Sequence, residues 1–414
     1  MNGYYRFFFT AIFVYCLFSF KINLIGEIRF DDFLAASLLP IFIAMNKKWV
    51  FIKGTNSIIL FVSFVVFSVL STLYNSSIGR IDLVQGLLFS IRNLEYIIFI
   101  VLGFFLAHYQ VKIDLIFKVY IFYALILISA QSLELLNPVS KFSPDRAIAN
   151  TGGPWELAAV SAFLIFYFLE KKEWIYFFLA GFILILTESR ITNLSVLLVL
   201  LFILLRYQPL KFIIGSVVSL VLILGYQFSN MLIEKNDLSN IEAQPSIITR
   251  VEQVFSSETL SNISNLTVTS QAVKSQDEYF ALTYGDELNS MLQEEGDVSA
   301  LIRFSRWSIL IPTTLDNFDS SLIGLGPSFA GKAVDGNYTR LFIETGVMGL
   351  VLYLVFFFSL LKFVKYSFLR NYLIVLALTA IFIDIFTTYK AMMLLWVFVG
   401  ILIYKKNILK VKWI

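Results

Sequence analysis

The stretch LTESRITNLSVLLVLLFILLR, residues 186–206, decides the fold class of this chain. Its second half is apolar enough to lie in hydrocarbon, whereas its first half carries Glu188, Ser189 and Arg190 in a row. A membrane-spanning helix needs about 20 mostly apolar residues, and charges inside such a helix are costly. The stretch therefore predicts a membrane helix that begins beside a charged cluster, and the cluster needs a chemical explanation.

Apolar runs of the same kind recur along the whole chain. Hydrophobic residues make up 58% of its 414 residues and charged residues only 15%, whereas charged residues are about a quarter of a typical soluble domain. We therefore predict an all-α polytopic membrane protein with about 12 transmembrane helices. The predicted spans are 5–20, 32–46, 56–74, 84–107, 113–136, 154–169, 174–187, 191–206, 212–229, 342–361, 371–388 and 391–404.

The basic residues between these spans predict the orientation of the chain. Lys and Arg concentrate in short cytoplasmic segments, and an N-terminus inside the cell gives the inner segments 16 of the 32 basic residues. We therefore expect both termini to be cytoplasmic. The predicted plan has nine spans in 1–228, one large outer loop at 229–338 and three spans in 339–414.

The outer loop is mostly acidic and polar, with 15 acidic and 6 basic residues. Its segment 235–298 is typical of a solvated linker. Near 299–315 the apolar residues recur at helical spacing, which predicts an amphipathic helix.

Cysteine and histidine are too scarce for several kinds of chemistry. The chain contains one Cys, Cys16, and one His, His108. An internal disulfide framework and a His-based metal site are therefore excluded. We expect no cofactor, no metal and no nucleic-acid partner.

Arginines on the predicted outer side need a cause, because topology disfavours them there. A guanidinium stays charged and presents a planar fork of donors that pairs bidentately with phosphate, and each charged hydrogen bond is worth roughly 1.5–3 kcal/mol. Several such forks around one outer site would hold a diphosphate. The alternative is that each arginine pairs with a nearby carboxylate or with lipid headgroups. The arginines near outer span ends are Arg146, Arg190, Arg303, Arg306 and Arg340.

Three further charges fall inside predicted spans. Arg92 and Glu95 lie in the fourth span at a spacing of three residues, so they either form an internal ion pair or line a polar cavity. Asp384 raises the same question, with Lys390 as a candidate partner.

Four stretches, taken in order, resemble motifs of the O-antigen polymerase and ligase superfamily of bacterial envelope glycosyltransferases. The first two are a Gly/Asn/Pro-rich turn that enters a span and a Ser-Arg at the head of a helix. The third is an Arg and a Trp followed by a Gly-x-Gly turn, and the fourth is an Asn followed by a Glu-x-Gly-x-x-Gly helix. They are RAIANTGGPWELAAV (146–160), LTESRITNLSVLL (186–198), RFSRWSILI (303–311) with SSLIGLGPSF (320–329), and DGNYTRLFIETGVMGLVLY (335–353).

The resemblance implies glycosyl transfer on the outer face of the bacterial cytoplasmic (inner) membrane by a multi-pass, GT-C-like protein. It implies sugars carried on undecaprenyl diphosphate as substrates, with neither nucleotide sugar nor metal. Membrane lipids and a chain-length regulator are the other partners that it implies. The ligases carry a His just before the Asn of the fourth motif, and here that position is Gly336, which favours a polymerase.

The resulting hypothesis gives each candidate residue a role. Arg190 and Arg303 hold the donor diphosphate, and Asp335 positions or deprotonates the acceptor hydroxyl in an inverting transfer. Asp335 can equally be a turn residue before Gly336, since Asp-Gly is a common turn pair. The expected substrate-binding residues are Arg306, Arg340, Glu188, Arg146, Asn337 and Arg92. The alternatives are a ligase, a flippase or transporter of lipid-linked sugars, and a non-catalytic scaffold.

Overall fold

The structure, a computed structural model, is mainly α-helical in the part of the chain that it describes. The predicted spans 32–46 and 212–229 and most of the predicted linker 235–298 lie outside that part. Two short strands, β1 (Asn23–Ile25) and β2 (Ile28–Arg29), pair antiparallel. The described residues are 2–20, 23–25, 28–29, 37, 40, 56–136, 146–207, 272–273, 275–284, 298–331, 334–365 and 367–407.

Ten helices in the described part coincide with predicted spans. Four of them, α3, α4, α5 and α16, are long and apolar enough to cross a membrane, and α1, α7, α8 and α17 contain shorter apolar helices. The prediction of a mainly helical chain is thereby confirmed, and four of its helices have the length and composition of membrane spans. The helices are α1 (Asn2–Phe18), α3 (Asn56–Ser77), α4 (Leu83–His108), α5 (Ile113–Ser132), α6 (Pro154–Lys171), α7 (Trp174–Leu186), α8 (Arg190–Tyr207), α16 (Asn337–Phe363), α17 (Phe368–Thr379) and α18 (Tyr389–Asn407).

Helix α3 shows how these helices divide between core and surroundings. Its buried side includes Phe61, Phe64 and Val65 together with small polar residues. Its other side exposes large apolar side chains at helical spacing, which water would disfavour and lipid tolerates. The exposed residues are Ile59, Val62, Val66, Leu70 and Leu73.

Contacts at one end of the helices join segments far apart in the sequence. The buried ammonium of Lys390, at the start of α18, donates to the backbone carbonyls of Leu17 (2.9 Å), Ser19 (2.8 Å) and Asn150 (2.8 Å). The end of α1, the turn before α6 and the start of α18 therefore lie together. The predicted orientation places all three outside, and we call this end of the bundle the outer end.

The opposite end joins the other termini of the helices. His108, the last residue of α4, lies 3.4 Å from the hydroxyl of Tyr404 near the end of α18. Lys406 of α18 donates to the carbonyl of Phe363, the last residue of α16. Helices α4, α16 and α18 therefore end together, at the end of the bundle opposite the last residues of α1.

Helices α4 and α18 cross with their backbones in close approach. A side chain at Gly103 would place its Cβ 1.8 Å from the carbonyl oxygen of Val397, and one at Gly400 would place it 2.1 Å from that of Ile100. Small residues at such crossings are the usual way for membrane helices to pack. The pairing fixes α18 in the middle of the fold, where it also contacts α6.

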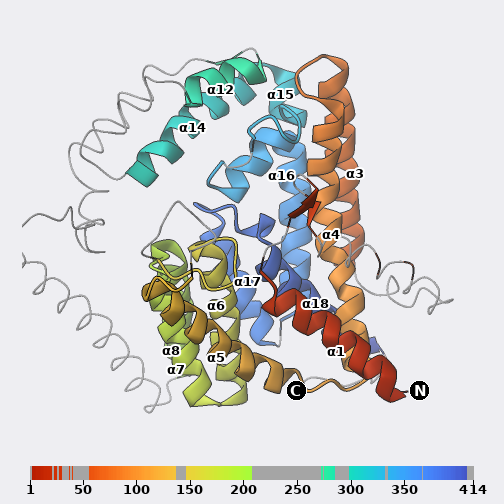
Figure 1. The fold of residues 1–414 in the computed structure, drawn as a ribbon. Coiled ribbons are helices and arrows are strands. Elements are labelled where there is room, and N and C mark those ends of the chain that lie inside the picture. The colour runs from red at the N-terminus through yellow and green to blue at the C-terminus, as the bar shows by residue number, and fades with distance from the viewer. Residues whose placement is uncertain are drawn as a thin grey trace, which may run out of the picture.

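Three further helices lie beyond the start of α16: α12 (Gln276–Tyr284), α14 (Val298–Leu315) and α15 (Phe318–Ile323), as Figure 1 shows. Helix α14 covers the range in which the sequence predicts an amphipathic helix. Leu310 of α14, Tyr279 of α12 and Ile343 of α16 share a second apolar core with Phe329. This core holds α14 over the first turns of α16.

Helix α16 is broken near its start. Gly346 has φ +64°, so the helical hydrogen bonds are interrupted there. The turn after α15 uses the carbonyls that the break leaves, because Leu325 N donates to Ile343 O (2.7 Å) and Gly326 N donates to Glu344 O (3.1 Å). The break sets the segment 337–345 as a separate short helix under α14.

Candidate functional site

Arg306 of α14 contacts the turn that precedes α16, and the charge of Arg303 also acts on Asp335 in that turn. Arg303 and Arg306 lie three residues apart, and therefore on one side of their helix. Arg306 Nη1 lies 2.7 Å from Asp335 Oδ2, with the arginine side chain 12% exposed and the aspartate side chain 34% exposed. Trp307 steadies this contact, since its Nε1 donates to the Val334 carbonyl (2.9 Å).

Arg340 lies deeper, in the first turns of α16. Its Nη2 lies 2.9 Å from Asp384 Oδ2, and its Nη1 lies 3.4 Å from Glu344 Oε1. The same Nη1 donates to the Gly331 carbonyl (3.4 Å). Two carboxylates therefore face one buried guanidinium, which balances part of their charge where water is scarce.

Asp384 lies in the connection between α17 and α18, where the sequence predicts membrane helix. The predicted span 371–388 is wrong in its second half, because α17 ends at Thr379 and a 3₁₀ helix, η1 (Ile385–Thr387), follows. A carboxylate inside an apolar helix would have no donors, whereas here Asp384 accepts from Arg340 and from the backbone. Its partner is thus Arg340, while the Lys390 ammonium contacts backbone carbonyls.

The carboxylate of Asp384 accepts from three successive backbone N–H groups. Oδ2 accepts from Val334 N (3.0 Å) and Asp335 N (3.3 Å), and Oδ1 accepts from Gly336 N (3.2 Å). Asp335 has a left-handed φ of +60°, which turns neighbouring N–H groups toward a common point, as in anion-binding nests. The turn 334–336 is therefore wrapped around one carboxylate.

The charged residues described so far form one group, which we call the charged cluster. Its three arginines and three carboxylates have formal charges that balance. Burial raises the pKa of Asp335, while the positive charges of Arg306, Arg303 and Arg340 lower it in part and the negative charge of Asp384 raises it further. Asp335 is therefore a carboxylate that takes up a proton more readily than an ordinary aspartate. The cluster consists of Arg303, Arg306, Asp335, Arg340, Glu344 and Asp384.

A second group of predicted residues surrounds the start of α8. Arg146 Nε donates to the carbonyl of Thr187 (3.0 Å), and Glu188 follows with a left-handed φ of +50°. Arg190 is the first residue of α8. The group lies at the outer end, because α8 packs on the last turn of α17, where Ser195 and Thr379 are in contact.

Two predicted residues fall outside both groups. Asn337 is 3% exposed, and its side-chain oxygen accepts from Phe386 N (2.9 Å), so its carboxamide joins α16 to η1. Arg92 lies on α4, one helical turn before Tyr96, whose hydroxyl donates to the Thr387 carbonyl (2.7 Å). No described contact joins Arg92 to the charged cluster.

No family model matches this sequence, and no curated protein matches it.

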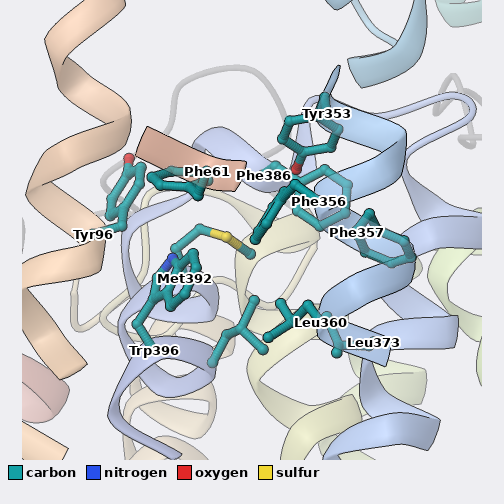
Figure 2. Close-up of a pocket in the computed structure, with 11 residues that line it drawn as sticks. Phe61, Tyr96, Tyr353, Phe356, Phe357, Leu360, Leu373, Phe386, Met392 and Trp396 are labelled. Carbon is teal, nitrogen blue, oxygen red and sulfur yellow. The ribbon is translucent and has the colours of Figure 1, made fainter. Parts of the chain in front are cut away.

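An apolar cavity of about 20 Å³ lies below the charged cluster, between α3, α4, α16, α17 and α18. That volume is little more than a single water molecule needs. Figure 2 shows Phe61, Phe356, Met392 and Trp396 pointing toward it. No charged side chain lines it, so this cavity is not a site for a phosphate group.

Sequence reasoning missed two members of the charged cluster as site residues, Glu344 and Asp384. The signal for Asp384 was a carboxylate in an apolar run, but its partner Arg340 lies 44 residues earlier. Among the described residues, no group of three or more His, Cys, Asp or Glu side chains could hold a metal ion. What the cluster offers is guanidinium forks for an anion and one partly exposed carboxylate for a proton.

Proposed function

We propose that this chain polymerises undecaprenyl-diphosphate-linked oligosaccharide repeat units on the outer face of the bacterial cytoplasmic membrane. The proposal includes the twelve-span, GT-C-like architecture and the cytoplasmic termini. One observation carries it: Arg306, which shares a side of α14 with Arg303, contacts the partly exposed carboxylate of Asp335 at the outer end of an apolar helix bundle. Forks that bind phosphate thus lie next to a group that can accept a proton.

Arg306 has spare capacity for a substrate. Its Nη1 contacts Asp335, while its buried Nε has no hydrogen-bond partner among the described residues. Buried polar groups are seldom left in this state. A diphosphate oxygen would satisfy that donor and compete with Asp335 for Nη1.

Replacement of Asp335 by a diphosphate oxygen at Arg306 would prepare Asp335 to act as the base. When the diphosphate neutralises Arg306, the charge that holds down the pKa of Asp335 is weakened, and Asp335 accepts a proton more readily. Binding of the donor and activation of the acceptor would thus be coupled through one side chain. Arg190 and Arg303 hold the rest of the diphosphate in this scheme, with Arg146 and Glu188 behind Arg190.

The transfer itself is a single displacement. The acceptor hydroxyl oxygen forms a bond to the anomeric carbon of the donor as the bond from that carbon to the diphosphate oxygen breaks. The electron pair leaves with the diphosphate, whose charge the arginines stabilise, and the hydroxyl proton passes to Asp335. Attack from the side opposite the leaving group inverts the configuration at that carbon.

The alternatives differ in what they require of the site. A ligase of the resembling type uses a His before the motif Asn, and the only His of this chain, His108, lies at the opposite end of the bundle beside Tyr404. A flippase needs charges along a path through the spans, whereas the charged cluster lies at the ends of helices.

A deletion strain complemented with variants tests the proposal through the length distribution of its surface glycan. Arg303→Lys and Arg306→Lys should each lower polymer yield about tenfold or more, because a point charge replaces a fork and a charged hydrogen bond is worth roughly 1.5–3 kcal/mol. Arg370→Lys, at the start of α17, is the matched control and should leave the polymer unchanged.

The intermediate that accumulates in the deletion strain separates the candidates. Single repeat units transferred to the final acceptor indicate a missing polymerase. Finished polymer that stays on its lipid carrier indicates a missing ligase, and carrier-linked units held on the cytoplasmic side indicate a missing flippase. Either of the last two results, or normal polymer from both Lys variants, would overturn the proposal.

A further inference from the structure

The connection between α17 and α18 carries an inference that rests on the proposed function. We infer that Asp384 is a positioning residue, whose carboxylate fixes the turn 334–336 and Arg340 and thereby sets where Asp335 stands for proton transfer. Asp384 itself does not touch the substrate in this assignment.

The hydrogen bonds of Asp384 argue for positioning rather than catalysis. Its two oxygens accept from Val334 N, Asp335 N, Gly336 N and Arg340 Nη2, at 2.9–3.3 Å. An ionised carboxylate offers about four acceptor sites, so this one is fully used. Its side chain is 13% exposed, against 34% for Asp335, so Asp335 is the carboxylate that a substrate can reach.

The turn depends on this carboxylate for its shape. Asp335 has φ +60°, a conformation that non-glycine residues hold only when their surroundings over-determine it. The three N–H groups that converge on Asp384 supply that constraint. Without the carboxylate they lose their acceptor, and Asp335 is free to leave the position in which it meets Arg306.

The fold around Asp384 has other attachments, so a mild substitution should leave it intact. Asn337 N donates to Ala380 O (2.9 Å), and the Asn337 side chain accepts from Phe386 N. The Tyr96 hydroxyl donates to the Thr387 carbonyl. These contacts hold the 380–388 segment against α16 and α4 independently of Asp384.

Asp384 also acts on Asp335 through its charge. Asp335 faces Arg303 and Arg306 from α14, Arg340 from α16 and Asp384 from the connection between α17 and α18. Replacing Asp384 by Asn removes a negative charge and leaves Arg340 less neutralised. Both changes lower the pKa of Asp335, so the acid side of the pH–rate profile should move to lower pH.

The test uses the full chain in lipid nanodiscs, with lipid-linked repeat units as substrate. Asp384→Asn should lower kcat about tenfold or more, change KM little, and shift the acid limb of kcat to lower pH. Asp384→Glu keeps the charge but adds a methylene, so it should lower kcat without that shift. Asp316→Asn, at the exposed end of α14, is the matched control and should change neither.

Hydrogen exchange in the same nanodiscs, without substrate, judges the contact separately. The amides of 334–336 should exchange faster in Asp384→Asn and at the wild-type rate in Asp316→Asn. Unchanged exchange, or a fall in rate by the same factor at every pH, would overturn the inference. An inactive wild-type protein would instead refute the proposed function, and with it the role of Asp384 in positioning Asp335 for proton transfer.

Discussion

In the proposed glycosyl transfer, Asp335 is the proton acceptor. Burial and the charge of Asp384 raise its pKa, and the arginines around it offset only part of that rise. As the pH falls through this raised pKa, Asp335 becomes protonated and can no longer accept the hydroxyl proton. The rate should therefore fall on the acid side at a pH above the ordinary aspartate value of about 3.9.

The pH dependence of the initial polymerisation rate measures this effect. Asp335→Asn should abolish the acid limb and lower the rate about 100-fold, the usual scale for loss of a general base. A wild-type rate that stays constant down to the ordinary aspartate pKa would show that Asp335 does not take up the proton.

Arg340 matters for stability more than for substrate contact. Its guanidinium contacts both Asp384 and Glu344, and removing one partner of a buried pair typically costs about 3–5 kcal/mol. Arg340→Met should lower the free energy of unfolding in detergent by about that amount. Arg370→Met, on a half-buried arginine, should change it by less than about 1 kcal/mol, and equal losses would contradict this role.

Residue spacing in the sequence predicted some of these contacts but could not predict others. Arg303 and Arg306 are three residues apart on a helix, so the sequence alone predicts that they share a side of that helix. The pairing of Arg340 with Asp384 joins two helix ends 44 residues apart. No local rule encodes such a contact, which depends on how α16 and α17 pack.

At the scale of elements, apolar runs located the helices well because burial in lipid or in the core demands the same side chains. The same dependence on apolar residues explains why the sequence did not predict the end of α17 or the break in α16. Both lie within apolar sequence, and their cause is a single residue in each case: Asp384, which needs donors from outside a helix, and Gly346, which allows φ +64°.

The break at Gly346 leads to a stability prediction, for which Gly181 provides the control. A Cβ there would lie 2.4 Å from the Leu322 carbonyl carbon, and the backbone (φ +64°, ψ −169°) is in a region essentially restricted to glycine, which costs other residues roughly 1–3 kcal/mol. Gly346→Ala should therefore lower the free energy of unfolding by about 2 kcal/mol or more. At Gly181, in α7, a Cβ meets nothing within 4 Å, so Gly181→Ala should leave stability unchanged or raise it by up to about 1 kcal/mol.

Unfolding of the two alanine variants in the same detergent measures the difference. A Gly346→Ala protein as stable as Gly181→Ala would show that α16 can run straight through this position. The first turns of α16 would then not need the break to reach α14.

At the scale of the whole molecule, the charge pattern predicts a chain that alternates direction, and the contacts place the last residues of α4, α16 and α18 together, opposite the last residues of α1. The side of the membrane is a separate prediction. In a Cys16→Ser background, Asp316→Cys at the end of α14 should react with a membrane-impermeant maleimide on intact cells. Lys365→Cys, after α16, should react only once the inner membrane is permeabilised, and the reverse pattern would refute the predicted orientation.

The ammonium of Lys390 has a consequence for biogenesis. It reaches the ribosome exit long after Leu17, Ser19 and Asn150, whose carbonyls it binds in the finished protein. Carbonyls left without donors are costly in a bilayer. These three carbonyls therefore lack the Lys390 ammonium as a donor until α18 has been synthesised and inserted. A nascent chain that ends before α18 would thus expose unsatisfied backbone carbonyls, a feature by which membrane quality control can recognise it.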